Sequence, residues 1–142
     1  MTYLLDTCVL SKLRKISKTK DKILQEWILK YSEEQYFLSV LTIGEIQQGI
    51  SKLEDAKHKR ILENWLSGDV LRRFENRILP IDARVATKWG DLSGISLKNG
   101  NPHPVIDGLI ASTAIVHDFI LVTENIKDFS KIEELKIFNP WE

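Results

Sequence analysis

Short apolar runs alternate along the chain with longer segments in which apolar residues recur at helical spacing. The runs are rich in strand-forming residues and too short for helices, so strands are predicted at 3–5, 36–40, 78–81, 119–122 and 136–138. Apolar residues at steps of three and four predict helices between these strands. Helices are expected near 9–13, over about 19–31, from 43 to 53, over about 56–76, and from Pro104 to about His117. A further helix is expected to begin after Asp82, which would be its N-cap.

This alternation of strands and amphipathic helices predicts an α/β domain with a mainly parallel sheet covered on both faces. The one segment dense in turn residues is 98–104, and no internal repeat or low-complexity tract divides the chain. We therefore expect residues 1–142 to form a single domain.

Composition agrees with an ordinary globular protein, with 43% apolar and 28% charged residues. The 20 basic and 20 acidic residues cancel, which does not favour bulk electrostatic binding of nucleic acid. Cys8 is the single cysteine, which excludes an internal disulfide and fits a reducing compartment. Since no run approaches a membrane span and the N-terminus has no basic leader, we expect a cytoplasmic location and no membrane contact.

Three acids interrupt or follow apolar segments that should form the core. Asp6 follows the first strand, Glu45 lies in the segment 40–46, and Asp107 lies in the segment 105–111. Acids are rarely buried without a partner, because an unpaired buried charge is costly. In parallel α/β sheets, ligands bind beyond the carboxyl ends of the strands. We expect the three acids to meet at this edge.

Each acid also has a local structural explanation. Asp6 could form an Asx turn or an N-cap, and Thr42 with Glu45 matches a capping box. Asp107, three residues after Pro104, could complement a helix dipole. A helix cap needs no second acid beside it, so the joint placement of the three favours a shared site.

Clustered carboxylates repel each other, and a divalent cation relieves that repulsion. Oxygen ligands select Mg²⁺, or alternatively Mn²⁺, over zinc. Such a cation keeps several waters and leaves room for a phosphate oxygen. The acids therefore indicate metal-dependent hydrolysis of a phosphodiester.

Other polar features carry weaker signals. Basic residues gather at 12–22, and Arg72, Arg73 and Arg77 form a smaller group. Either group could equally be a solvated face. The three histidines lack zinc-like spacing, and Cys8 is expected to be a small core residue. An aspartyl-nucleophile phosphatase would need a second acid where Cys8 stands.

The chain resembles the PIN-domain ribonucleases, and within them the VapC-type toxins of toxin–antitoxin pairs, in particular the FitB-like branch. The resemblance covers nearly the whole chain in the right order. The segments that carry it are 5–11, 39–50, 78–82, Trp89-Gly90, 106–114, 121–125, Asp128-Phe129 and Asn139-Pro140-Trp141.

The resemblance implies a three-layer α/β/α sandwich and an acidic metal site. It maps the catalytic and metal-binding acids to Asp6, Glu45 and Asp107. A fourth metal-binding position is implied at Asn125, where many relatives carry a charged residue, with Asp128 ranked lower. Thr7 and Thr123 match positions that support the site through their hydroxyl groups.

Family membership would further imply a type II toxin that cleaves cellular RNA, with tRNA or ribosomal RNA as the expected classes. A cognate VapB-type antitoxin and a homodimer are implied as partners, and Lys12, Arg14 and Lys15 are candidates for RNA contacts. Two departures stand out, Cys8 where many relatives have Asn, and Asn101 in the loop where they have Arg. The alternative is a non-catalytic PIN-like module whose acidic pocket binds an ion or a basic partner segment.

Overall fold

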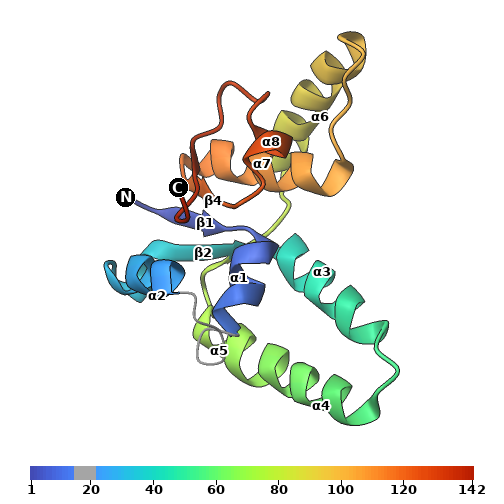
Figure 1. The fold of residues 1–142 in the computed structure, drawn as a ribbon. Coiled ribbons are helices and arrows are strands. Elements are labelled where there is room, and N and C mark those ends of the chain that lie inside the picture. Colours follow the sequence, from blue (N-terminus) through green and yellow to red (C-terminus); the bar gives the residue numbers. More distant parts are fainter. Residues whose placement is uncertain (15–21) are drawn as a thin grey trace.

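A five-stranded parallel sheet forms the centre of the protein, as seen in a computed structural model that describes residues 1–14 and 22–142. The strand order is β3-β2-β1-β4-β5, and every neighbouring pair is parallel (Figure 1). The strands are β1 (Tyr3–Leu5), β2 (Tyr36–Ser39), β3 (Ile78–Leu79), β4 (Ile120–Val122) and β5 (Ile137–Phe138). All five predicted strands are confirmed, each within two residues of its expected ends.

Helices cover both faces of this sheet. The helical elements are α1 (Thr7–Arg14), α2 (Lys22–Leu29), η1 (Glu33–Gln35), α3 (Val40–Ser51), α4 (Ala56–Asn64), η2 (Trp65–Val70), α5 (Leu71–Arg73), α6 (Ala83–Lys98), α7 (Val105–His117) and α8 (Ile126–Phe129). In Figure 1, α1, α2 and α5 lie on one side of the strands, and α6, α7 and α8 on the other.

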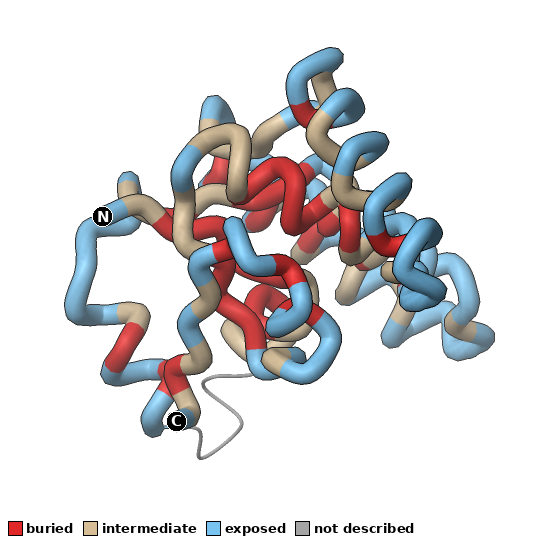
Figure 2. Tube along the Cα trace, turned by 90° about the horizontal axis from the view of Figure 1, so that it is seen from above, coloured by how far each residue is buried: buried red, intermediate tan, exposed pale blue. Residues whose placement is uncertain are grey.

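Two hydrophobic clusters correspond to these two layers. Tyr3 and Leu5 belong to the cluster that includes residues of α1, α2 and η2, whereas Leu4 belongs to the cluster with α7 and α8. Alternate residues of a strand point to opposite faces, so β1 contributes to both cores. Figure 2 shows the buried backbone running through the middle of the molecule, within a shell of exposed positions. The predicted α/β/α sandwich is confirmed.

Some predicted helix boundaries require correction. Pro104 is the residue before α7 rather than its first residue. Of the helix predicted over 19–31, the described part is Lys22–Leu29, and residues 15–21 lie outside the described part. The helix predicted over 56–76 runs from Ala56 to Arg73 and widens to a π-helix at Trp65–Val70. Asp82 is the N-cap of α6, as predicted, and its side chain accepts a hydrogen bond from the Val85 amide.

The strand order places a crossover point at β1. The chain passes from β1 to β2 on one side and reaches β4 on the other. A crevice opens beyond the carboxyl ends of the strands at such a point. Asp6, directly after Leu5, occupies that place. No helix in the described part of the chain is long and apolar enough to span a bilayer.

Candidate functional site

Asp6 is buried at the carboxyl end of β1, with only 5% of its surface exposed. Its backbone amide continues the sheet by donating to Val122 of β4. Its Oδ2 accepts a 2.8 Å hydrogen bond from Thr123 Oγ1, and its Oδ1 accepts from the Thr7 amide at 2.9 Å. The second bond lies at the start of α1, as expected for a local turn. Asp6 thus forms this turn and also belongs to the acidic site.

Glu45 lies in the second turn of α3 and faces the start of α1. Thr7 Oγ1 donates to Glu45 Oε1 at 2.6 Å and lies 3.1 Å from Thr42 Oγ1. The capping-box interpretation of Glu45 is wrong, because α3 already begins at Val40 and its N-cap is Ser39. Glu45 is therefore not occupied by the helix end.

Thr42 is a residue of the site that sequence reasoning did not identify. It is fully buried on α3 and contacts Thr7. Its spacing of three residues from Glu45 places both on one helix face. That spacing was the available signal, but it equally matches a capping box.

Asp107 approaches from the first turn of α7. The next residue, Gly108, is buried against Trp89 of α6, and a Cβ at position 108 would lie only 3.1 Å from Trp89 Cδ1. The absence of a side chain at Gly108 thus allows close packing of α7 on α6. Asp107 directly precedes this contact point on α7.

The segment after β4 supplies the fourth side of the site. Thr123 is fully buried, and its Oγ1 accepts from the Asn125 amide at 3.0 Å while donating to Asp6. Asn125 therefore contacts the site through its backbone amide. The charge of Asp128, in α8, acts on both Asp6 and Asp107. Asp128 therefore has the more direct electrostatic link to the acids.

The acids disturb each other's protonation. The pKa of Asp107 is raised to about 6, mainly by burial and in smaller part by the negative charges of Asp6, Asp128 and Glu45. Burial also raises the pKa of Asp6, against hydrogen bonds from Thr123, Thr7 and Cys8 that lower it. No ion pair found between described residues involves any of these acids. The cluster is thus an uncompensated concentration of negative charge.

The chemistry of this donor set fits a hard divalent cation. All of the acids offer oxygen ligands, and the buried Asp6 has no basic partner among the described residues, which leaves its charge to be balanced by a ligand. Within the described residues, however, no three His, Cys, Asp or Glu side chains are already grouped to hold a metal ion. Hydroxyl and amide donors occupy the oxygens of Asp6 and Glu45.

The predicted RNA-contacting residues have intramolecular partners. Lys12 Nζ donates to Glu124 at 2.7 Å and lies 4.6 Å from the ring centroid of Trp141. The guanidinium of Arg14 lies 5.8 Å from the ring of Trp65. Lys15 falls outside the described residues.

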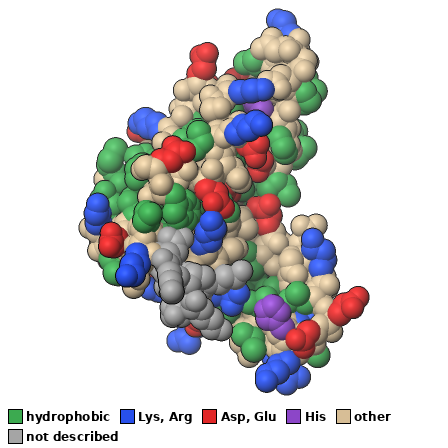
Figure 3. All heavy atoms as spheres, viewed as in Figure 1, with side chains coloured by type: hydrophobic (Ala, Val, Ile, Leu, Met, Phe, Trp, Pro, Cys, Tyr) green, Lys and Arg blue, Asp and Glu red, His purple; other side chains and the backbone are tan. Residues whose placement is uncertain are grey.

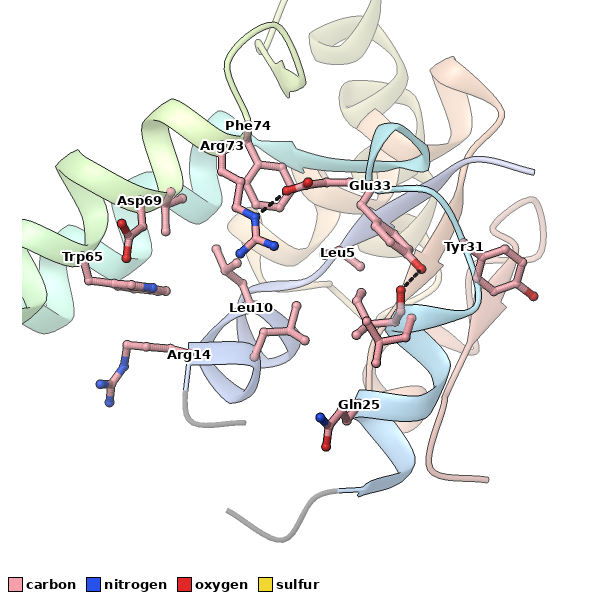
Figure 4. A pocket seen from close by; sticks show the side chains of 15 residues that line it. Leu5, Leu10, Arg14, Gln25, Tyr31, Glu33, Trp65, Asp69, Arg73 and Phe74 are labelled. Atoms are coloured by element: carbon pink, nitrogen blue, oxygen red, sulfur yellow. Dashed lines mark hydrogen bonds and ion pairs between the residues drawn. The ribbon is translucent and has the colours of Figure 1, made fainter. Parts of the chain in front are cut away.

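An apolar cavity of about 410 Å³ lies apart from the acids, between α1, α2 and the helical segment η2–α5. Figure 4 shows Leu5 and Leu10 at its centre, and Arg14 and Arg73 among the charged residues around it. Leu5 and Asp6 are neighbours, yet Asp6 is not among the lining residues. The cavity therefore offers a separate, mainly hydrophobic surface.

Comparisons with known proteins place this chain in a family. The PIN domain family model matches residues 3–135. The chain is 33% identical to "VapC ribonuclease Y4jK" of Sinorhizobium fredii, covering 97% of this chain and 96% of that protein. It is 30% identical to "Toxin FitB" of Neisseria gonorrhoeae, covering 97% of each.

Solved structures give the same result at the level of the fold. The FitAcB crystal structure from Neisseria gonorrhoeae superposes with a TM-score of 0.89, at 29% identity and 99% coverage of both chains. VapBC2 from Rickettsia felis, bound to a promoter DNA fragment, superposes with a TM-score of 0.75, at 28% identity and 98% coverage of both chains.

Proposed function

Since this chain belongs to the PIN-domain family, we propose that it is a metal-dependent endoribonuclease that acts as the toxin of a type II toxin–antitoxin pair. Its similarity to a VapC ribonuclease and to a FitB toxin supports this assignment. Its substrate would be cellular RNA, of the tRNA or ribosomal RNA class. Its cofactor would be Mg²⁺, with Mn²⁺ as the alternative.

One observation carries the proposal: Asp6 is 5% exposed, has no basic partner among the described residues, and interacts electrostatically with Asp107. A structural acid at a strand end would be solvated or paired. Acids that share a desolvated crevice are typical of a site whose charge is balanced by a ligand.

The site residues would have distinct roles. Asp6, Glu45 and Asp107 would hold the metal, with Asn125 or Asp128 completing the ligand set. A bound divalent cation would stabilise negative charge on the phosphoryl oxygens and make a coordinated water more acidic. Water would attack the phosphorus, one of the three acids would accept its proton, and the leaving oxygen would depart with the other RNA fragment. Thr7 and Thr123 would fix the orientations of Glu45 and Asp6.

The partners are inferred from the relatives. Structural neighbours of this chain include FitAB and VapBC complexes, so we expect a VapB-type antitoxin to bind this chain. We also expect a homodimer, and a cytoplasmic location where RNA is accessible.

Cleavage by the purified protein tests this proposal. Bulk tRNA and ribosomal RNA should be cut in the presence of Mg²⁺ or Mn²⁺ and left intact with EDTA. Asp107→Asn should remove this cleavage, and Asp6→Ala should remove both cleavage and growth inhibition in cells while the fold is retained. Full toxicity of Asp6→Ala would refute the metal-site assignment.

A non-catalytic binding module is the second candidate, in which the buried Asp6 and its neighbouring acids would bind an ion or a basic partner segment without hydrolysis. It predicts no metal-dependent cleavage across a broad RNA panel. It also predicts that Asp107→Asn weakens binding of an ion or of a basic partner segment.

A further inference from the structure

Lys12 joins three segments that are far apart in the sequence. It projects from α1, its Nζ donates to Glu124 Oε2 at 2.7 Å, and it lies 4.6 Å from the centre of the Trp141 ring. Glu124 follows β4, and Trp141 belongs to the C-terminal segment. Figure 3 shows basic and acidic side chains next to each other on the face that carries α1. The Lys12 ammonium is therefore held at a defined place on the surface.

This place adjoins the acidic site. Glu124 directly follows Thr123, whose hydroxyl donates to Asp6. Cys8, which follows Asp6 on α1, contacts the acidic site, since its Sγ is 3.7 Å from Asp6 Oδ2 and 3.7 Å from Thr123 Oγ1. The charge of Glu124 also reaches Cys8. An RNA strand whose scissile phosphate lies at the acids would thus bring a neighbouring phosphate close to Lys12.

The ion pair can be exchanged at low cost. Its two side chains are 41% and 36% exposed, and ion pairs this exposed contribute little to stability. A phosphate oxygen offers Lys12 an equivalent charge-assisted hydrogen bond. The Trp141 ring attracts the ammonium without consuming a hydrogen-bond donor. Lys12 can consequently exchange Glu124 for a phosphate while the Trp141 ring holds the ammonium in place.

On the basis of the ribonuclease function proposed above, we propose that Lys12 binds an RNA phosphate beside the acidic site and that Glu124 competes with this phosphate for the same ammonium. Removing the lysine then weakens RNA binding, whereas neutralising the glutamate strengthens it. A structural latch between α1 and the C-terminal segment would behave differently. Either substitution would break that latch, so both would act in the same direction.

Binding of labelled RNA to an uncleaving protein tests this. In an Asp107→Asn background, the affinity for fluorescein-labelled bulk tRNA and ribosomal RNA fragments is measured by anisotropy for Lys12→Met, Glu124→Gln and the double variant. Lys12→Met should weaken binding about five-fold at low salt and reduce the salt slope by about one. Glu124→Gln should tighten binding several-fold, and this gain should vanish in the double variant. Lys12→Arg should keep most of the affinity.

Lys136→Met is the matched control. Lys136 also pairs with an acid, Asp118, at 2.9 Å, but both precede their strands and so lie at the opposite edge of the sheet. Its substitution should leave RNA binding unchanged. Two outcomes would overturn the proposal, provided that the wild-type protein cleaves the RNA. One is that Lys12→Met binds RNA as tightly as its parent. The other is that Lys12→Met and Glu124→Gln shift the affinity in the same direction. If the wild-type protein neither binds nor cleaves it, the proposed function itself fails.

Discussion

Thr123 Oγ1 donates a 2.8 Å hydrogen bond to Asp6 Oδ2, and both atoms are buried. The two residues are 117 positions apart in the sequence, at the carboxyl ends of the adjacent parallel strands β4 and β1. The bond gives the most buried acid of the site a fixed donor. It also links β1 to β4, which are the neighbouring strands at which the order of the strands in the sheet reverses.

Thr123→Val should destabilise the protein at pH 7 by about 1–3 kcal/mol, because the buried Asp6 carboxylate loses a donor without gaining another. Since that hydrogen bond lowers the pKa of Asp6, its removal raises this pKa further. The destabilisation should therefore shrink as the pH falls and Asp6 becomes protonated. Urea denaturation at pH 7 and pH 4 measures both effects.

Thr123→Ser is the control, because it keeps the hydroxyl group. It should retain most of the stability that Thr123→Val loses. If Thr123→Ser lost as much stability as Thr123→Val, keeping the hydroxyl group would not keep the stability, and this would contradict the role given to the hydrogen bond.

Asp107→Asn should stabilise the metal-free protein at neutral pH. The folded-state pKa of Asp107 is raised to about 6, so the folded state binds this proton more tightly than the unfolded state, whose pKa is about 4. The favourable contribution of the protonated acid is complete below about pH 4 and is lost as the pH rises to about 6. Allowing for solvent screening, we expect a gain of about 1 kcal/mol at pH 7.

Thermal unfolding of both proteins in EDTA between pH 4 and pH 8 tests this. The two curves should converge at the acidic end and separate as the pH rises. A constant difference over the whole range would show that Asp107 does not carry a raised pKa in the folded protein.

Most of the fold was predictable because its strands are short, apolar and regularly separated by helices. The pattern does not contain the strand order, which depends on how β4 and β5 pack beside β1. The change to π-helical geometry at Trp65–Val70 was also not predictable, because helical spacing of apolar residues continues through it.

The site was partly predictable for a different reason. The position of Asp6 was predictable, because a residue directly after a strand of a parallel sheet lies at the carboxyl end of the sheet, where ligands bind. Glu45 remained ambiguous, because one sequence fits both a capping box and a second-turn acid. The start of α3 at Val40 decides between them, and it depends on Ser39 serving as the N-cap. The contact of Gly108 with Trp89 depends on how two helices cross, which neither segment encodes alone.

Thr7→Val should weaken Mn²⁺ binding about ten-fold, as is typical when a residue that orients a metal ligand is removed. The Thr7 hydroxyl donates to Glu45 Oε1 at 2.6 Å, and valine keeps its shape without that donor. Mn²⁺ titration followed by thermal shift measures the change. Thr87→Val is the control, because the hydrogen bond that the Thr87 hydroxyl makes to a described residue lies within its own helix, at Ala83 O. Equal Mn²⁺ affinity of Thr7→Val and wild type would contradict the role given to Thr7.

Gly108→Ala should reduce RNA cleavage far more than it reduces stability. The new Cβ would lie 3.1 Å from Trp89 Cδ1 and 3.2 Å from Trp89 Nε1, so α7 or the indole must shift by a few tenths of an ångström. The better helix propensity of alanine, worth up to about 1 kcal/mol, offsets much of this strain. Asp107 is the residue directly before Gly108 in α7, and small displacements of catalytic groups are costly for rate.

Trp89→Phe in the Gly108→Ala background tests whether the contact itself is responsible. A smaller ring leaves room for the alanine, so the double variant should recover part of the cleavage rate that Gly108→Ala loses. Residues in direct contact show such coupling, whereas distant ones add independently. Cleavage rates and urea denaturation of the two single variants and the double variant provide the cycle. If the two substitutions reduce cleavage independently, the packing of α7 against Trp89 does not set the position of Asp107.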